Sequence, residues 1–236
     1  GNMTAIIDYA RASMNFIQKD NIAVTGHSMG GMISLATLIQ YENLEAKGQG
    51  KSPITAILEV GFDPVSTIPI PVFKSQLEKY PVHWGIIAAK YDEWFFKSPD
   101  VNNDPRRFLE SDLARNLINQ LETVKITGNV ENKKIYKGTI EGNSYIRVIF
   151  QNEEIHPKNH FSRDAAAEAS TFFYEALGVP SGYSYIDPNN QTWEWKEFFN
   201  FLGLVGILLF LFPFAALIMD NVPHFSDLKA KTPTPP

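Results

Sequence analysis

The sequence predicts an α/β fold, in which parallel strands form a sheet with helices on both faces, followed by a C-terminal transmembrane helix. Two observations indicate the sheet. The apolar runs ITAILEV at 54–60 and HWGIIAAK at 83–90 are typical of strands that are covered on both faces, and helical patterns alternate with them. The third observation is FLGLVGILLFLFPFAALIM at 201–219, a stretch without one charged side chain.

In the first half of the chain, helical and strand patterns alternate. Ile6, Ala10 and Met14 follow one another at four-residue spacing and therefore fall on one face of a helix. The patterns predict, in order, a helix at 4–18, a strand at 22–25, a helix at 29–46, the strand at 54–60, a helix around 72–80 and the strand at 83–90.

Three further elements are expected before the apolar segment. They are a helix at 106–121, a β-hairpin at 133–150 that turns through Glu141-Gly142-Asn143, and a helix at 163–177. Ser162 is predicted to cap the N-terminus of the last of these helices, and Gly178 directly follows its C-terminus. We therefore expect one folded domain at 1–178.

Composition excludes several classes of function. The chain has 236 residues, a net charge of −5 and an isoelectric point near 5.6. Because no basic stripe interrupts this acidic balance, we expect no nucleic-acid partner. There is no cysteine, which excludes disulfides, thiolate catalysis and cysteine-based zinc sites.

The uncharged segment predicts a membrane anchor. A bilayer core requires about 20 apolar residues in a helix, so we expect a transmembrane helix at 198–220. Trp193 and Trp195 precede it and suit the aromatic belt of a membrane interface. The composition of 179–197 predicts a linker, and that of 221–236 predicts a disordered tail.

The lysines that flank this segment favour one orientation. Lys229 and Lys231 follow it, whereas Lys196 precedes it. Positive residues favour the cytoplasmic side, so we expect the folded domain outside the cytoplasm.

The chemistry is suggested by Gly26-His27-Ser28-Met29-Gly30, which fits the pattern G-x-S-x-G. The motif lies between a predicted strand and a predicted helix. A serine at such a tight turn projects its Oγ above the sheet, and residues two positions away must be small. The sequence therefore predicts Ser28 as a nucleophile. The alternative is a glycine-rich turn with an incidental serine.

A nucleophilic serine of this kind is followed along the chain by an acid and then by a histidine. Asp92 comes just after the strand at 83–90, at the end of the sheet where active-site loops lie. It would orient the histidine and stabilise the imidazolium. Glu93 beside it and Asp63 after the preceding strand are the alternatives.

His160 is the predicted general base. It lies just before the last helix of the domain, and His156 in the same loop is the alternative. The other three histidines are less suitable by position, because one is inside the motif, one opens a strand and one follows the apolar segment; they are His27, His83 and His224. Pro157 separates His156 from His160 and excludes a helical metal site.

With these stretches, GHSMGG, IIAAKYDEWF and the NHFS before the final helix, the chain resembles the α/β-hydrolase family. It is most similar to dienelactone-hydrolase-like and lipase-like members fused to membrane segments, and the resemblance covers roughly 4–178. It implies a partial α/β-hydrolase sheet and hydrolysis of an ester or related acyl bond through a Ser28 acyl-enzyme. It also implies no metal or organic cofactor.

The chain departs from this family at its start. In the family several strands precede the serine turn, whereas here only 21 residues precede Ile22. We therefore expect a further segment or chain to supply the missing N-terminal strands. The backbone N–H of Met29 is expected to donate one oxyanion hydrogen bond, and the second donor has no visible source.

Two function classes follow from these observations. The first is a membrane-tethered serine hydrolase that acts on a small-molecule acyl substrate, with Ser28, Asp92 and His160 as its triad. The second is a non-catalytic hydrolase-like domain in a membrane assembly. An acyltransferase with the same triad is the third possibility, because water and an alcohol compete for one acyl-enzyme.

Overall fold

The computed structural model of the chain describes residues 2–64 and 80–226. It divides into two compact units, Gly1–Asn189 and Asn190–Pro236. Nearly all of the predicted helix at 72–80, and residues 227–236 of the predicted tail, lie outside the described part.

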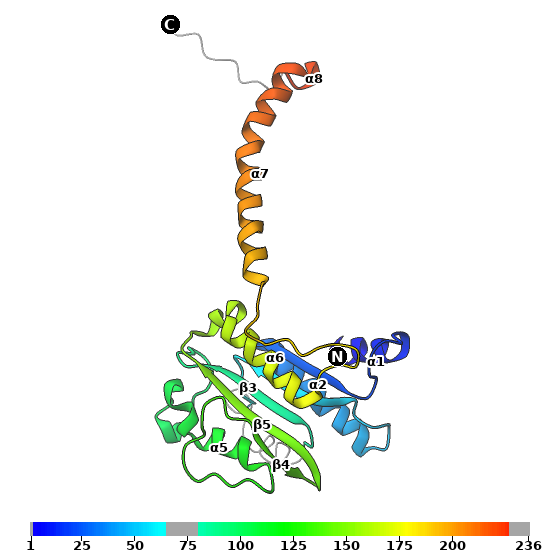
Figure 1. Cartoon of the computed structure of the whole chain (residues 1–236), viewed down its shortest axis with the longest axis vertical. Helices are drawn as coiled ribbons and strands as arrows, with labels where there is room; N and C mark the ends of the chain where they lie inside the picture. Colours follow the sequence, from blue (N-terminus) through cyan, green and yellow to red (C-terminus); the bar gives the residue numbers. More distant parts are fainter. Residues whose placement is uncertain (1, 65–79, 227–236) are drawn as a thin grey trace. The chain divides into compact units, whose positions relative to one another are not determined.

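The described strands of the first unit form one sheet in the order β1-β2-β3-β5-β4 (Figure 1). Strands β1, β2, β3 and β5 run parallel, and β4 is an antiparallel strand at one edge. The bounds are β1 Ile22–His27, β2 Ile54–Val60, β3 His83–Ala89, β4 Tyr136–Ile140 and β5 Asn143–Asn152. The α/β class and the largely parallel sheet are therefore confirmed.

Helices cover both faces of the sheet, as predicted. Helix α2 (Met29–Ala46) packs against β1 and β2, and α6 (Arg163–Leu177) packs against β2, β3 and β5. Neighbouring side chains of β2 point to opposite faces: Ile57 belongs to the same apolar cluster as Leu35 of α2, and Leu58 to the same cluster as Phe172 of α6. The cluster beneath α2 also includes side chains of α1 (Asn2–Ser13) and α5 (Asp112–Asn119).

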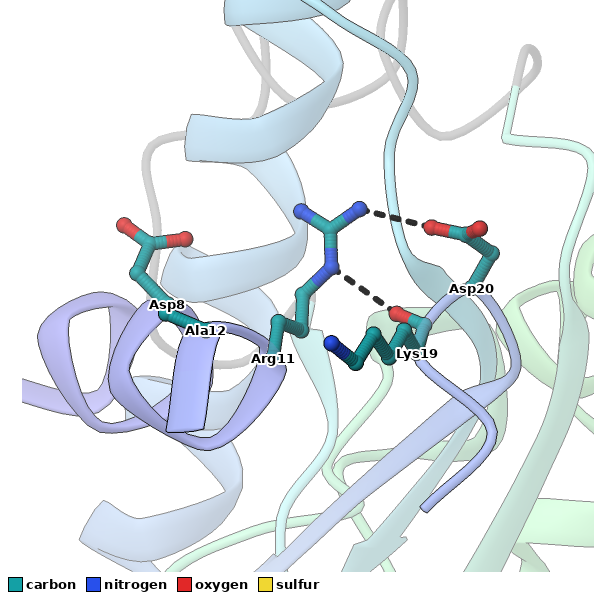
Figure 2. A pocket seen from close by; sticks show the side chains of 5 residues that line it. All are labelled: Asp8, Arg11, Ala12, Lys19 and Asp20. Atoms are coloured by element: carbon teal, nitrogen blue, oxygen red, sulfur yellow. Dashed lines mark hydrogen bonds and ion pairs between the residues drawn. The ribbon is translucent and has the colours of Figure 1, made fainter. Parts of the chain in front are cut away.

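The first helix is shorter than the predicted 4–18, because α1 ends at Ser13. Arg11 explains how the chain turns back at this point. Its Nη2 lies 2.6 Å from Asp20 Oδ1, and its Nε donates a hydrogen bond of 2.8 Å to the carbonyl of Lys19. These contacts hold the approach to β1 against the last turn of α1, beside a small surface pocket (Figure 2).

The predicted helix at 106–121 is divided into two. A 3-10 helix, η2 (Pro105–Glu110), comes first, and α5 begins after Ser111. The Ser111 hydroxyl accepts a hydrogen bond of 3.2 Å from the N–H of Ala114, so this serine caps a new helix instead of continuing the old one.

The last two elements of the unit form as predicted. Strands β4 and β5 make a hairpin whose turn residues Glu141 and Gly142 have φ of 50° and 79°. Glycine is well suited to such a turn because it adopts positive φ without steric cost. Ser162 Oγ accepts a hydrogen bond of 3.0 Å from Ala165 N–H, which caps α6.

The second unit is dominated by α7, a helix of 29 residues from Trp193 to Asn221. Its mean hydropathy over the most apolar window is 2.7, and none of that window is buried. It is the one helix among the described residues that is long and apolar enough to cross a membrane. The helix begins within the predicted linker of 179–197 and continues through Pro213. A short helix, α8 (Pro223–Ser226), follows it.

Candidate active site

Ser28 occupies a strained turn between β1 and α2. Its φ of 56° and ψ of −118° lie outside the regions that a residue with a side chain prefers. The Ser28 N–H donates a hydrogen bond of 2.9 Å to the carbonyl of Val60, at the end of β2. The side chain does not cap α2, although serine is a preferred capping residue. The turn therefore keeps the hydroxyl away from the helix backbone that it could otherwise bind.

The glycines around Ser28 differ in how closely they are packed. A Cβ added to Gly26 would lie 2.3 Å from the carbonyl carbon of Gly30, and one added to Gly31 would lie 2.8 Å from Cβ of Phe62. A Cβ on Gly30 would meet no atom within 4 Å. The requirement for a small residue is therefore steric at Gly26 and Gly31 but not at Gly30, the second glycine of the motif.

Asp92 and His156 form a buried pair at the carboxyl end of the sheet. His156 Nδ1 lies 2.7 Å from Asp92 Oδ2, and both side chains are buried. Asp92 Oδ1 accepts hydrogen bonds from the N–H groups of Trp94 and Phe95 at 2.9 and 2.8 Å. In a neutral imidazole paired with an ionised carboxylate, Nδ1 donates the hydrogen bond and Nε2 carries a lone pair.

The carboxylates considered as alternatives to Asp92 bind backbone groups. Glu93 Oε2 accepts from the N–H of His156 at 3.2 Å, and Asp63 Oδ2 accepts from the N–H of Phe96 at 2.6 Å. Asp92 bonds the imidazole of His156. The structure thus pairs the predicted acid with a histidine of the predicted loop.

That histidine is His156 and not His160, so the expected pairing of His160 with Asp92 is wrong. Strand β5 extends to Asn152, and a 3-10 helix, η3 (His156–Phe161), begins after three intervening residues. This short connection places the first residue of η3 over the loop that holds Asp92. Four residues further along, the His160 side chain is exposed and contacts the ring of His27, with 3.8 Å between the ring centroids.

His27 also lies among these residues, although its position inside the motif made it a less suitable candidate for the base. Its Nε2 lies 3.0 Å from the backbone carbonyl of His156. A carbonyl can only accept, so Nε2 is the protonated nitrogen. Burial lowers the pKa of His27 below its usual value, which keeps the ring neutral near pH 7. Its position in the sequence could have indicated this. His27 directly precedes Ser28 and ends β1, at the same carboxyl end of the sheet as the loop of His156.

Gly61 lies between the turn of Ser28 and the two histidines and packs closely against both imidazole rings. It follows Val60, to which Ser28 is bonded, and has a φ of 56°. A Cβ at Gly61 would lie 2.8 Å from His27 Nε2 and 3.2 Å from His156 Cε1. In the described part of the chain no hydrogen bond joins the side chains of Ser28 and His156. Catalytic hydrogen bonds are often long without substrate and tighten when it binds.

The other two histidines belong to other elements. His83 opens β3 at the amino end of the sheet, where its Nδ1 accepts a hydrogen bond of 3.2 Å from Ile146 N–H. His224 belongs to α8 in the second unit. Among residues 2–64 and 80–226, no group of three or more histidine, aspartate or glutamate side chains is arranged to hold a metal ion.

Met29 is the first residue of α2, where a backbone N–H has no acceptor within the helix. Such an N–H can donate to a developing negative charge. Comparison of the chain with protein-family models, with curated proteins and with solved structures finds no match.

Proposed function

We propose that the protein is a membrane-tethered serine hydrolase that cleaves an ester or related acyl bond. The observation that supports this most strongly is a serine held at positive φ between a parallel strand and a helix. It lies at the same carboxyl end of the sheet as the buried Asp92–His156 pair. Strain of this kind is concentrated at functional sites. The order Ser28, Asp92, His156 along the chain is also the order of the α/β-hydrolase family.

The resemblance to that family is part of the proposal. The parallel order β1-β2-β3-β5, with the acid after β3 and the histidine after β5, is consistent with the second half of an α/β-hydrolase sheet. Among the described strands, β1 pairs with β2 alone, which leaves one of its edges open. We propose that a strand from a further segment or from another chain pairs with this edge.

The reaction would proceed through an acyl-enzyme. Ser28 Oγ attacks the acyl carbon while His156 Nε2 takes its proton, and Asp92 stabilises the resulting imidazolium through Nδ1–H. The Met29 N–H donates to the oxyanion. When the intermediate collapses, the alcohol leaves with the proton from Nε2. Water then attacks the acyl-enzyme by the same steps, which releases the acid and restores Ser28.

A fluorophosphonate probe tests this proposal, because it reacts only with an activated serine. The full-length protein in mild detergent should be labelled, and Ser28→Ala should abolish labelling, whereas Ser170→Ala on the exposed side of α6 should retain it. His156→Ala should slow labelling by about 10²–10⁴-fold, the usual contribution of a general base. His160→Ala should change the rate by less than about tenfold, because His160 is not bonded to Asp92.

Two results would contradict the proposal in different ways. Equal labelling of the Ser28→Ala variant would remove Ser28 as the nucleophile. If His160→Ala is labelled slowly while His156→Ala is labelled at the normal rate, His160 is the general base. If no labelling occurs at all, the alternative of a non-catalytic domain in a membrane assembly is favoured. Transfer of an acyl group to an added alcohol in preference to water would identify an acyltransferase.

We also propose that α7 spans a membrane with the hydrolase domain outside the cytoplasm. At 1.5 Å per residue its 29 residues extend about 43 Å, and a bilayer core is about 30 Å thick. The orientation is supported by the lysine count of the sequence, two after the helix and one near its start.

A further inference from the structure

Large apolar side chains are exposed after three of the four parallel strands, at the carboxyl end of the sheet. Met29 follows β1 and is 68% exposed, Trp94 follows β3 and is 59% exposed, and Phe161 follows β5 and is 67% exposed. We call these three side chains the apolar rim. Single exposed apolar residues are ordinary. Three of them around one proposed active site point to a shared role in binding.

One residue of the apolar rim, Trp94, contacts the proposed catalytic histidine. The Trp94 ring meets the His156 ring edge to face, with 4.9 Å between the centroids. The row continues from His156 to His27 at 4.5 Å, from His27 to His160 at 3.8 Å, and from His160 to Phe161 at 6.0 Å. Trp94 and Phe161 therefore stand at the two ends of a continuous row of rings, and Met29 is the neighbour of Ser28.

The position of Trp94 is also fixed by the catalytic acid. Asp92 Oδ1 accepts the Trp94 N–H at 2.9 Å, so the same carboxylate that holds His156 sets the backbone of Trp94. With its backbone fixed and its ring against His156, the indole presents an apolar surface at little cost in conformational entropy. It is suited to a ligand that must be aligned with the imidazole.

We propose that the apolar rim binds the acyl chain of the substrate, and that the enzyme prefers esters of medium or long unbranched fatty acids to those of short ones. The inference rests on the proposed function. The occupant is an acyl chain because the rim is continuous with the rings beside the reacting bond. A chain of methylenes extending from the acyl carbon would reach the rim without leaving the site.

The expected size of the preference follows from the exposure of the rim. Full burial of a methylene strengthens binding by about fourfold, and an open rim that covers about half of the chain gives about twofold. Octanoate has four more methylenes than butyrate. The full-length protein should therefore have a kcat/KM for the octanoate ester about 15-fold above that for the butyrate ester.

The experiment compares p-nitrophenyl butyrate and p-nitrophenyl octanoate with the full-length protein in lipid nanodiscs. The readout is the ratio of the two kcat/KM values, which cancels any general loss of catalysis. In the double variant Trp94→Gln, Phe161→Gln the ratio should fall from about 15 to below about 3. Phe16→Gln is the matched control: it removes a side chain that is 80% exposed but lies before β1, at the opposite end of the sheet, and should keep the ratio of the unaltered protein.

Each alternative outcome overturns a different statement. If Ser28-dependent hydrolysis of both esters occurs with a ratio near one, the inference fails and the proposed function stands. The inference fails as well if the double variant keeps the full ratio, since the preference then arises elsewhere. If neither ester is hydrolysed and Ser28 is not labelled, the proposed function fails together with the inference.

Discussion

The packing around Ser28 makes a quantitative prediction for substitution of its three glycine neighbours. In Gly26→Ala the new Cβ would lie 2.3, 2.4 and 2.7 Å from the carbonyl carbon, the carbonyl oxygen and the Cα of Gly30. All three are backbone atoms of the first turn of α2, so no side chain can rotate away. The end of β1 and the start of α2 would have to separate by about 1 Å to restore ordinary contacts.

Overpacking against side chains that can adjust costs about 1–3 kcal/mol. Because backbone must move here, we expect Gly26→Ala to lower the free energy of unfolding by about 3 kcal/mol or more. Gly31→Ala should cost less, since its closest contact is the Phe62 side chain at 2.8 Å. Gly30→Ala should be neutral or stabilising by up to about 1 kcal/mol, because its Cβ would meet nothing and alanine favours a helix.

Urea unfolding of the full-length variants in mild detergent, followed by pulse proteolysis, measures these differences. The expected order of stability is Gly30→Ala, then Gly31→Ala, then Gly26→Ala. Equal midpoints for Gly26→Ala and Gly30→Ala would refute the reasoning, since the two would then have similar surroundings. Rapid fluorophosphonate labelling of Gly26→Ala would separately contradict the view that the strained turn activates Ser28.

Two further predictions concern other parts of the chain. Burial, reinforced by the charge of Arg147, lowers the pKa of His83 from 6.5 to about 4. As the pH falls, the imidazole of His83 therefore takes up a proton in the unfolded chain before it does so in the folded chain. The contribution of the neutral ring to folding stability is complete above about pH 6.5 and is lost as the pH falls towards 4. Between pH 7 and 4 the unfolding free energy should drop by about 1–2 kcal/mol more than in His83→Gln, less than the full shift because the ring is partly solvated, and equal pH profiles would contradict this. For α7, a reporter that is active only in the cytoplasm should be active when it is fused after Pro236. Release of the protein from membranes by carbonate would contradict the proposal that α7 spans a membrane.

Elements with strong local signals could be predicted from the sequence. The bounds of α2, 29–46, and of β2, 54–60, agree with the structure. The α6 helix also agrees, because its cap at Ser162 and the glycine after its end are local features. The long apolar run of α7 needs no tertiary information either. In each case the residues that determine the element lie within it or next to it.

Elements whose ends depend on distant contacts were predicted less well. Helix α1 stops at Ser13, although the apolar pattern continues beyond it, where Arg11 reaches across to Asp20. Ser111 starts a new helix within a pattern that reads as continuous. The placement of β5 between β3 and β4 likewise depends on which edge the hairpin joins, and hydrophobic periodicity carries no information on that choice.

The proposed site shows the same limit within a single loop. The turn that carries Ser28 could be located because a strand, three small residues and a helix are adjacent in sequence. The choice between His156 and His160 depends instead on where β5 ends and on the tight turn of η3, which brings the first of its residues over Asp92. Proximity to the following helix favoured His160, but what matters is the distance from the strand that precedes the loop. The chain leaving β5 reaches the loop of Asp92 at His156, whereas His160 lies four residues further along η3. For this reason the first histidine after the strand, and not the last before the helix, is the one paired with the acid.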